Sequence, residues 1–290
     1  MRYVLILLIL IAALAGGALY LTRPIPVAES RLSSLSGDAA AGELVFYASG
    51  CSSCHLAPES EDPMLLAGGQ RFATEFGTFV APNISSHPEQ GLGSWTQAQF
   101  ASAVLEGVSP EGAHYYPAFP YSSYTRMSDQ DVVDLWAFMQ TLPASDAASQ
   151  PHELALPFQF RQPLGIWKAL YVTDGWRLRR VETPEVERGR YLVEALGHCG
   201  ECHTERNLLG ALDQDTWLAG APNPSGQGRI PAIHPDRLNW SDTDIAYYLE
   251  TGFTPDFDSA GGSMAAVVRN YAKLPPEDRA AVAAYLKALP

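Results

Sequence analysis

The sequence contains few cysteines and little basic charge. It has four cysteines among 290 residues, and all four belong to two short motifs, so none remains for a structural disulfide. Nineteen Lys and Arg residues stand against 32 Asp and Glu residues, which gives a net charge of −13. Nucleic acid binding needs a basic face, so the composition argues against a nucleic acid partner. The charge fits either plain solubility or a surface that meets a basic or mixed-charge protein.

Strand signals are also nearly absent. The chain consists of segments with helical periodicity, joined by long loops rich in Pro and Gly such as residues 56–94. Loops of this length are uncommon in a compact domain unless something else organises them. A large flat cofactor in the core would organise them. Because helical patterns dominate and strand signals are nearly absent, we predict an all-α fold.

The N-terminus is a long apolar run, from Tyr3 to Leu21. This is about the length that a bilayer span needs. A secretory signal peptide is the alternative, because Ala13-Leu14-Ala15 resembles a small-x-small cleavage site. The run continues past that site, so an anchor formed by residues 1–23 is favoured. Both interpretations place everything after Arg23 across the membrane.

The two halves of the chain repeat each other. "DVVDLWAFMQTLP" matches "DRAAVAAYLKALP" without a gap, and "GELVFYASGCSSCH" matches "GRYLVEALGHCGECH" with one extra residue in the second copy. Thr96 and Ser241 each open a helix with the pattern of a capping box. We expect two similar helical domains, at residues 38–143 and 186–290.

Residues 144–185 link the two domains. They begin as a polar linker and become aromatic and basic, with five basic residues against one acid between residues 157 and 180. This segment is either a strap packed across both domains or a docking surface for a partner subunit or lipid headgroups.

Each cysteine belongs to a Cys-x-x-Cys-His motif, at Cys51–His55 or Cys199–His203. This spacing is the sign of covalent c-type haem attachment, in which Cys51, Cys54, Cys199 and Cys202 form thioethers and His55 and His203 bind iron. A thioredoxin-like site would follow a strand in a βαβ unit, and a four-cysteine zinc site would bring its pairs closer in sequence. Two disulfides would not explain a histidine after each pair. We therefore predict two haem c groups.

Methionine is the usual second axial ligand in electron-transferring cytochromes c. Met127 and Met264 both lie between the middle and final helices of their repeats, where that ligand is expected. Met139 lies on a helix face and is expected in the core, and Met64 follows His55 too closely to cross a haem. The histidines in polar or Pro-rich loops, for which we expect surface positions, are His87, His114 and His234.

With these residues in place, the chain resembles class I cytochromes c. It is most similar to the cytochrome c subunits of membrane-bound alcohol and gluconate dehydrogenases, through "APNISSHPEQGLGSWTQAQF", "GVSPEGAHYYPAFPYSSYTRMSDQDV", "GHCGECHTERNLLG" and "GGSMAAVVRNYAKLPPEDRAAVAAYLKALP". Those subunits usually carry three haems, whereas this chain has two motifs, and Phe119 stands where some relatives have Met. The difference puts direct reaction with quinone in doubt.

The resemblance implies further roles. Pro82 and Pro231 place a backbone carbonyl against Nδ1–H of the haem histidines. Trp95 and Trp240 either donate Nε1–H to a haem propionate or serve as ordinary aromatic packing. Gly42 and Gly189 let the first helix of each repeat cross the last closely, against Phe138 and Tyr285.

The implied function is electron transfer, without substrate chemistry of the chain's own. The fold is then two tandem class I cytochrome c domains behind one transmembrane helix in a bacterial inner membrane, with the haem domains in the periplasm. The donor is a dehydrogenase for alcohols, aldehydes or sugars, and the acceptor is a soluble cytochrome or a terminal oxidase. The alternatives are a di-haem subunit of a haem–copper oxidase and, in a different class, a di-haem peroxidase or thiosulfate dehydrogenase.

Overall fold

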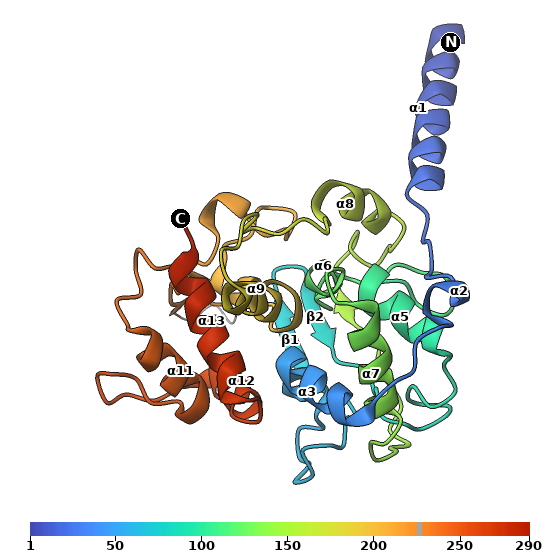
Figure 1. Ribbon diagram of the computed structural model, residues 1–290. Coiled ribbons are helices and arrows are strands. Elements are labelled where there is room, and N and C mark those ends of the chain that lie inside the picture. Colours follow the sequence, from blue (N-terminus) through green and yellow to red (C-terminus); the bar gives the residue numbers. More distant parts are fainter. Residues whose placement is uncertain (225–227) are drawn as a thin grey trace.

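The computed structural model describes residues 1–224 and 228–290. Helix α1 (Arg2–Leu21) projects away from the rest of the protein, and none of its residues is buried (Figure 1). Its mean hydropathy reaches 2.7, and it is the one helix in these ranges that is long and apolar enough to cross a membrane. At 1.5 Å per residue it measures about 30 Å, the thickness of a bilayer core.

The first helical unit is built on the crossing of α3 (Ala39–Ser49) and α7 (Asp129–Met139). Gly42 lies at the crossing, where a Cβ would lie 1.9 Å from the carbonyl oxygen of Asp134. Only glycine lets the two helices approach so closely. The remaining helices of this unit are α2 (Glu29–Leu32), α4 (Cys51–His55), α5 (Gln97–Glu106) and α6 (Tyr121–Tyr124).

The second unit repeats this crossing with α9 (Pro184–Tyr191) and α13 (Pro276–Ala288). Gly189 takes the place of Gly42, since a Cβ there would lie 1.9 Å from the carbonyl oxygen of Ala281. The close crossings expected from the resemblance are therefore both present. The other helical elements here are η1 (Leu192–Leu196), α10 (Gly200–His203), η2 (Gln214–Thr216), α11 (Asp242–Thr251) and α12 (Gly262–Tyr271).

The middle helices begin and end as the sequence indicates. Both α5 and α11 open with a complete capping box, formed by Thr96 with Gln99 and by Ser241 with Asp244. Both end at a glycine in the left-handed conformation, which allows the chain to turn away without strain.

The extra residue of the second repeat is absorbed by a π-helix, η1, immediately before the second motif. A π turn accommodates one additional residue without breaking the helix. His198, with φ of 39°, then takes the position that Gly50, with φ of 63°, has in the first repeat. Each of these left-handed residues directly precedes the first cysteine of a motif, so the two motifs leave their helices in the same way.

The prediction of an all-α fold is too narrow. Residues 71–80 form a hairpin of β1 (Arg71–Thr74) and β2 (Gly77–Val80), and β3 (Glu153–Leu154) adds a third strand. Cross-strand pairing of Phe72 with Phe79 stabilises the hairpin. An alternation of four residues is too short to be distinguished from a loop in sequence. The second unit has a similarly short pair, β4 (Ala221–Pro222) with β5 (Arg229–Ile230).

Residues 144–185, here called the strap, pack across both units, as the first of the two interpretations expects. On the first unit, β3 pairs with β2, and Arg126 Nε donates to the carbonyl of Gly175 over 3.0 Å. On the second unit, Trp167 of α8 (Leu164–Tyr171) donates Nε1–H to the carbonyl of Leu209 over 2.9 Å. The strap thus holds the two units together.

The expectation of a surface position is wrong for His114, which is 5% exposed. Its Nε2–H donates to the carbonyl of Thr22 over 3.0 Å, and Lys168 of the strap lies beside its Nδ1. The residue therefore joins residues 22–28, here called the stem of α1, to the strap. These segments are far apart in sequence. Met139, by contrast, lies in the core as predicted, with 2% exposure.

Candidate haem sites

Each Cys-x-x-Cys-His motif folds into one short helical turn, α4 or α10. Cysteines three residues apart on such a turn lie on the same side of it. None of the four cysteines forms a disulfide. Each pair is thus arranged for two neighbouring bonds to one flat group, with the adjacent histidine beside it.

Hydrogen bonds orient both histidine rings. His55 Nδ1–H donates to the carbonyl of Pro82 over 2.9 Å, and His203 Nδ1–H donates to the carbonyl of Pro231 over 2.7 Å. Within residues 1–224 and 228–290, Nε2 of neither ring has a hydrogen-bond partner. Burial lowers the pKa of both rings, which favours the neutral form that binds a metal. Each Nε2 is left as a ligand atom.

Two glycines that sequence reasoning missed support these rings. The backbone N–H of Gly68 donates to the carbonyl of His55, and that of Gly220 donates to the carbonyl of His203, both over 2.8 Å. A Cβ on Gly68 would lie 2.5 Å from the carbonyl oxygen of Pro82, which accepts the hydrogen bond from the His55 ring. Only glycine leaves room for that carbonyl. The signal was present in the sequence, because Leu-Ala-Gly recurs at residues 66–68 and 218–220.

The cysteines of the first motif are partly accessible. Cys54 is exposed and Cys51 is half-buried, and yet burial raises the pKa of Cys51 to about 12. Burial, and then the nearby Cys202 thiol, raise the pKa of Cys54 to about 11. The residues fit a covalently held haem in donor type and placement.

The candidate distal ligands lie on the elements that follow. Met127 is 4% exposed, and its backbone N–H donates to the carbonyl of Tyr124 just before α7 begins. Met264 is half-buried in the first turn of α12 and packs against the core. Trp95 and Trp240 are half-buried against the same core, and the ring of Trp240 contacts that of Tyr248.

The two motifs face each other across the boundary between the units. Asn270 of α12 accepts a hydrogen bond from Ser52 and donates one to Ser53, so it reaches both middle residues of the first motif. Glu201, a middle residue of the second motif, accepts a hydrogen bond from Ser122 over 2.9 Å. Each motif is therefore fixed by a side chain of the other unit.

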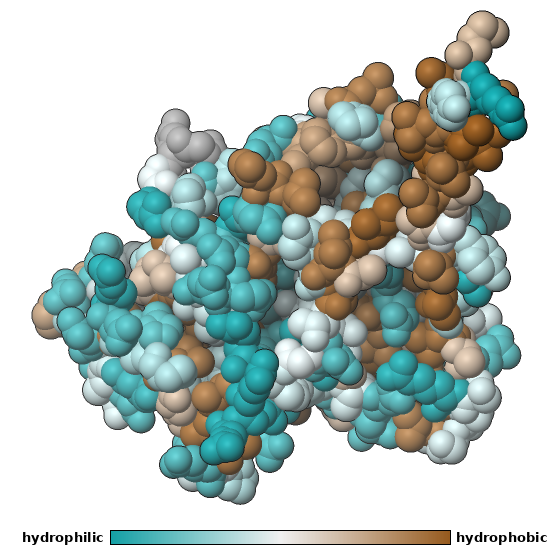
Figure 2. All heavy atoms as spheres, turned by 90° about the horizontal axis from the view of Figure 1, so that it is seen from above, coloured by the Kyte–Doolittle hydropathy of each residue, from teal (hydrophilic) through white to brown (hydrophobic). Residues whose placement is uncertain are grey.

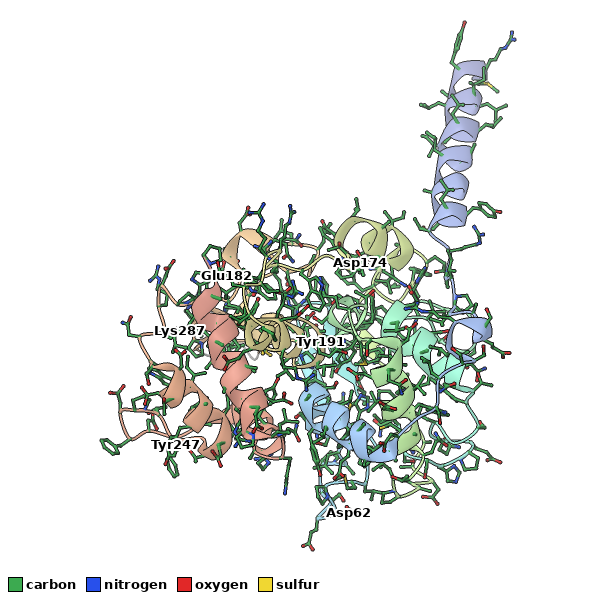
Figure 3. The ribbon with its side chains drawn as sticks, in the orientation of Figure 1. Asp62, Asp174, Glu182, Tyr191, Tyr247 and Lys287 are labelled. Atoms are coloured by element: carbon green, nitrogen blue, oxygen red, sulfur yellow. The ribbon has the colours of Figure 1, made fainter. Side chains whose placement is uncertain are left out.

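Two further residues close this boundary. His198 Nε2 donates to the carbonyl of Ser49 over 3.3 Å. This histidine therefore lies between the units, and its Nε2 is occupied by a hydrogen bond. Tyr191 lies between the units in Figure 3, where its hydroxyl accepts the backbone N–H of Ser128 and donates to the carboxylate of Asp131.

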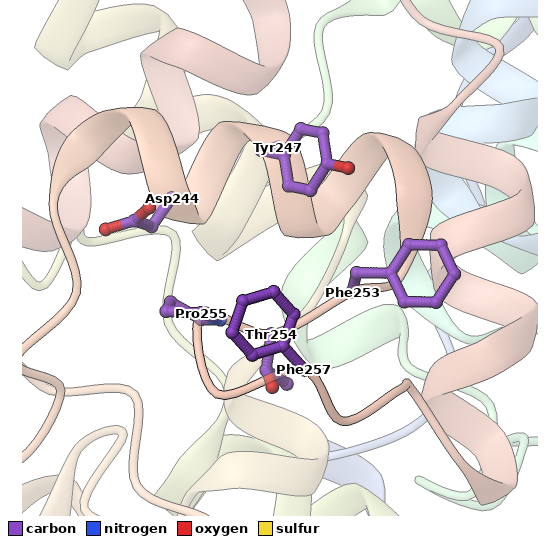
Figure 4. A pocket seen from close by; sticks show the side chains of 6 residues that line it. All are labelled: Asp244, Tyr247, Phe253, Thr254, Pro255 and Phe257. Atoms are coloured by element: carbon purple, nitrogen blue, oxygen red, sulfur yellow. The ribbon is translucent and has the colours of Figure 1, made fainter.

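A shallow hollow away from both motifs lies at the end of α11 (Figure 4). It is formed mainly by exposed aromatic rings, and Phe257, with φ of 64°, is 97% exposed. No side chain in it is arranged as a haem ligand. The hollow is lined by Asp244, Tyr247, Phe253, Thr254, Pro255 and Phe257.

Known proteins are similar to this chain in sequence. A "Diheme cytochrome c-type" protein of Cereibacter sphaeroides is 56% identical over 285 residues, which is 98% of this chain and 96% of that protein. The fructose dehydrogenase cytochrome subunit of Gluconobacter japonicus is 36% identical over 93% of this chain. The cytochrome c subunit of the quinone alcohol dehydrogenase of Gluconobacter oxydans is 32% identical over 86%.

The chain spans about half the length of the last two relatives, 55% and 54%. The sequence model described as "Cytochrome c" matches residues 39–143 and again residues 186–290. Since both repeats match and both contain an attachment motif, the chain belongs to the cytochrome c family and carries two covalently bound haems.

Proposed function

We propose that this protein is a di-haem electron carrier, anchored in the bacterial inner membrane, without catalysis of its own. It takes electrons from a dehydrogenase in the periplasm and passes them to a soluble cytochrome or a terminal oxidase. The dehydrogenase partner is suggested by the relatives, several of which are cytochrome subunits of dehydrogenases. The domains are residues 38–143 and 186–290, with the strap between them.

In this proposal His55 and Met127 bind the iron in the first domain, and His203 and Met264 bind it in the second. When bound, each haem iron takes up and releases one electron. The methionine favours the reduced form. The Pro82 and Pro231 carbonyls keep each histidine ring in position and raise its basicity as a ligand. Trp95 and Trp240 are candidates to donate Nε1–H to the haem propionates.

The observation that carries the proposal is the facing arrangement of the two motifs. Electron transfer between two cofactors depends on how the protein positions them. Here Asn270 and Glu201 hold each motif against the other unit. Two independent haem domains on a flexible linker would not need these contacts. An electron that enters at one site has a short path to the other.

Anchoring is proposed from α1, which has the length and apolar character of a bilayer span. Haem attachment on the periplasmic side places residues 24–290 outside the cytoplasm. Arg2 then remains on the cytoplasmic side, in agreement with the positive-inside rule.

Purification of the full chain from detergent-solubilised membranes tests the proposal. A dehydrogenase is expected to co-purify, and its substrate should reduce both haems of the complex. Co-purification with copper and b-type haem would instead assign the chain to an oxidase. A high-spin haem together with turnover of peroxide or thiosulfate would make it an enzyme.

An interface variant tests the path between the haems. Asn270→Ala removes both hydrogen bonds to the first motif and should slow electron exchange between the two haems after rapid reduction of one. Thr254→Ala, in the hollow at the end of α11, is the matched control and should leave the exchange rate unchanged. Equal rates in the two variants would contradict the role given to the interface.

A further inference from the structure

The stem of α1 is held tightly against α8. Thr22, one residue beyond α1, accepts a hydrogen bond from His114, and the same carbonyl lies against Gly165 of α8. A Cβ on Gly165 would lie 2.0 Å from that oxygen, so no residue larger than glycine fits at this contact. Helix α8 therefore lies at the level where α1 leaves the protein, as Figure 1 shows.

Helix α8 is oriented opposite to an ordinary surface helix. Its Lys168 points inward, where Nζ donates to the carbonyl of Glu106 and lies 5.4 Å from the ring centre of Tyr121. Its Ile166 and Leu170, four residues apart on one side, are exposed, Leu170 by 68%. A helix in contact with water normally turns its apolar side inward. This one presents its apolar side outward.

The apolar surface continues beyond α8. Phe158 of the strap packs on Phe76 with ring centres 4.9 Å apart, and Phe76 lies against Gly210, next to Leu209. Figure 2, seen from above, shows apolar side chains gathered around the base of α1. Contiguous apolar surface of this kind marks an interaction site. We call the exposed side chains Leu156, Phe158, Phe160, Ile166, Leu170 and Leu209 the strap face.

The segment that carries most of the strap face differs in charge from the whole protein. Residues 157–180 carry five basic residues and one acid in a chain of net charge −13. Arg179 and Arg180 at the end of this segment are exposed. Aromatic side chains together with basic ones are typical of segments that lie in the interface of a bilayer. A basic segment is also attracted by anionic headgroups.

We propose that the strap face lies on the surface of the bilayer, with α8 in the membrane plane and phospholipid as its partner. The inference rests on the proposed anchoring by α1, because α1 fixes which side of the protein meets the membrane. Two attachments, a span and an interfacial face, prevent the haem domains from swinging about the stem. They leave the hollow at the end of α11 directed away from the membrane.

Photolabelling tests this orientation. The full haem-loaded chain is placed in nanodiscs that contain anionic phospholipid and a phospholipid with a photoreactive group near its headgroup. After irradiation and digestion, mass spectrometry should find lipid adducts on residues 156–171 as well as on α1. The matched control is the loop at residues 253–257, which also carries exposed aromatic side chains and should carry no adduct.

A variant sharpens the result. Phe160→Glu combined with Leu170→Glu should reduce strap labelling several-fold and leave α1 labelling unchanged. Both side chains are already exposed, so the protein should keep its fold and haem spectrum. Labelling of α1 with no strap labelling above that of residues 253–257 would refute the strap face alone. Strap labelling without α1 labelling would refute the anchor and support the strap face.

A protein partner would be a different outcome. A photoreactive amino acid placed at position 170 should give no protein adduct in native membranes. A discrete adduct with a second protein, together with absent lipid labelling, would overturn the proposal and assign the strap face to a partner subunit.

Discussion

Replacement of Gly68 by alanine tests how the first haem histidine is held. Gly68 has φ of +72°, and its N–H donates to the carbonyl of His55. An alanine Cβ would lie 2.5 Å from the carbonyl oxygens of Ala81 and Pro82 and from the carbonyl carbon of Pro82. All three are backbone atoms, so relief requires movement of the segment that orients the ring.

The expected loss of stability has two parts. A left-handed conformation costs an L-residue roughly 1–2 kcal/mol. Insertion of a methyl group into a packed site costs about 1–3 kcal/mol more. Gly68→Ala should therefore lower the free energy of unfolding by about 2–5 kcal/mol. Gly112→Ala is the matched control, because Gly112 has φ of +75° and nothing within 4 Å of its Cβ position. Gly112→Ala should lower the free energy of unfolding only by the cost of the left-handed conformation.

The assay combines denaturant unfolding with a potentiometric titration of the holoprotein. If the Pro82 carbonyl moves, its hydrogen bond to His55 weakens and the ring becomes a poorer electron donor to iron. The potential of one haem should then rise in Gly68→Ala and stay unchanged in Gly112→Ala. Equal destabilisation of the two variants with unchanged potentials would refute the reasoning.

Two further predictions concern the iron ligands and the stem of α1. Met127→Ala and Met264→Ala should each lower the potential of one haem and make it high-spin, whereas Met139→Leu should change neither. A normal low-spin spectrum in either alanine variant would refute that ligand. Burial, and then the charge of Lys168, lower the pKa of His114. In the unfolded state His114 binds a proton at higher pH, near 6.5, so acidification below that value should weaken the contact between the stem of α1 and α8. Hydrogen-exchange protection in α8 should then fall. His114→Gln should weaken this pH dependence, and an unchanged profile would contradict it.

Local chemistry made much of this protein predictable. The attachment motifs, the capping boxes at Thr96 and Ser241, and the crossing glycines each depend on residues a few positions apart or on one backbone requirement. The repeat strengthened these predictions, since a pattern found twice is rarely accidental. The same comparison contained Leu-Ala-Gly at residues 66–68 and 218–220. The glycine of each copy donates its backbone N–H to the carbonyl of the haem histidine.

Other features had no local signature. The extra residue of the second repeat was visible in the sequence, but a loop and a π-helix accommodate it equally well. The strand alternation at residues 71–80 is too short to separate from a loop, and pairing with β3 depends on a segment more than seventy residues away. His114 lies among polar residues in sequence, and only the arrival of Thr22 and Lys168 buries it.

The sequence by itself determined that two haems are attached, at Cys51–His55 and Cys199–His203, because covalent attachment requires those residues at that spacing. The tertiary structure decided that the two sites face each other and that α8 turns its apolar side outward. Both depend on common residues, such as Asn270, Glu201 and Lys168, whose role is set by a partner far along the chain. An asparagine or a lysine has no distinctive pattern in sequence, and it acquires its role only when folding supplies the neighbour.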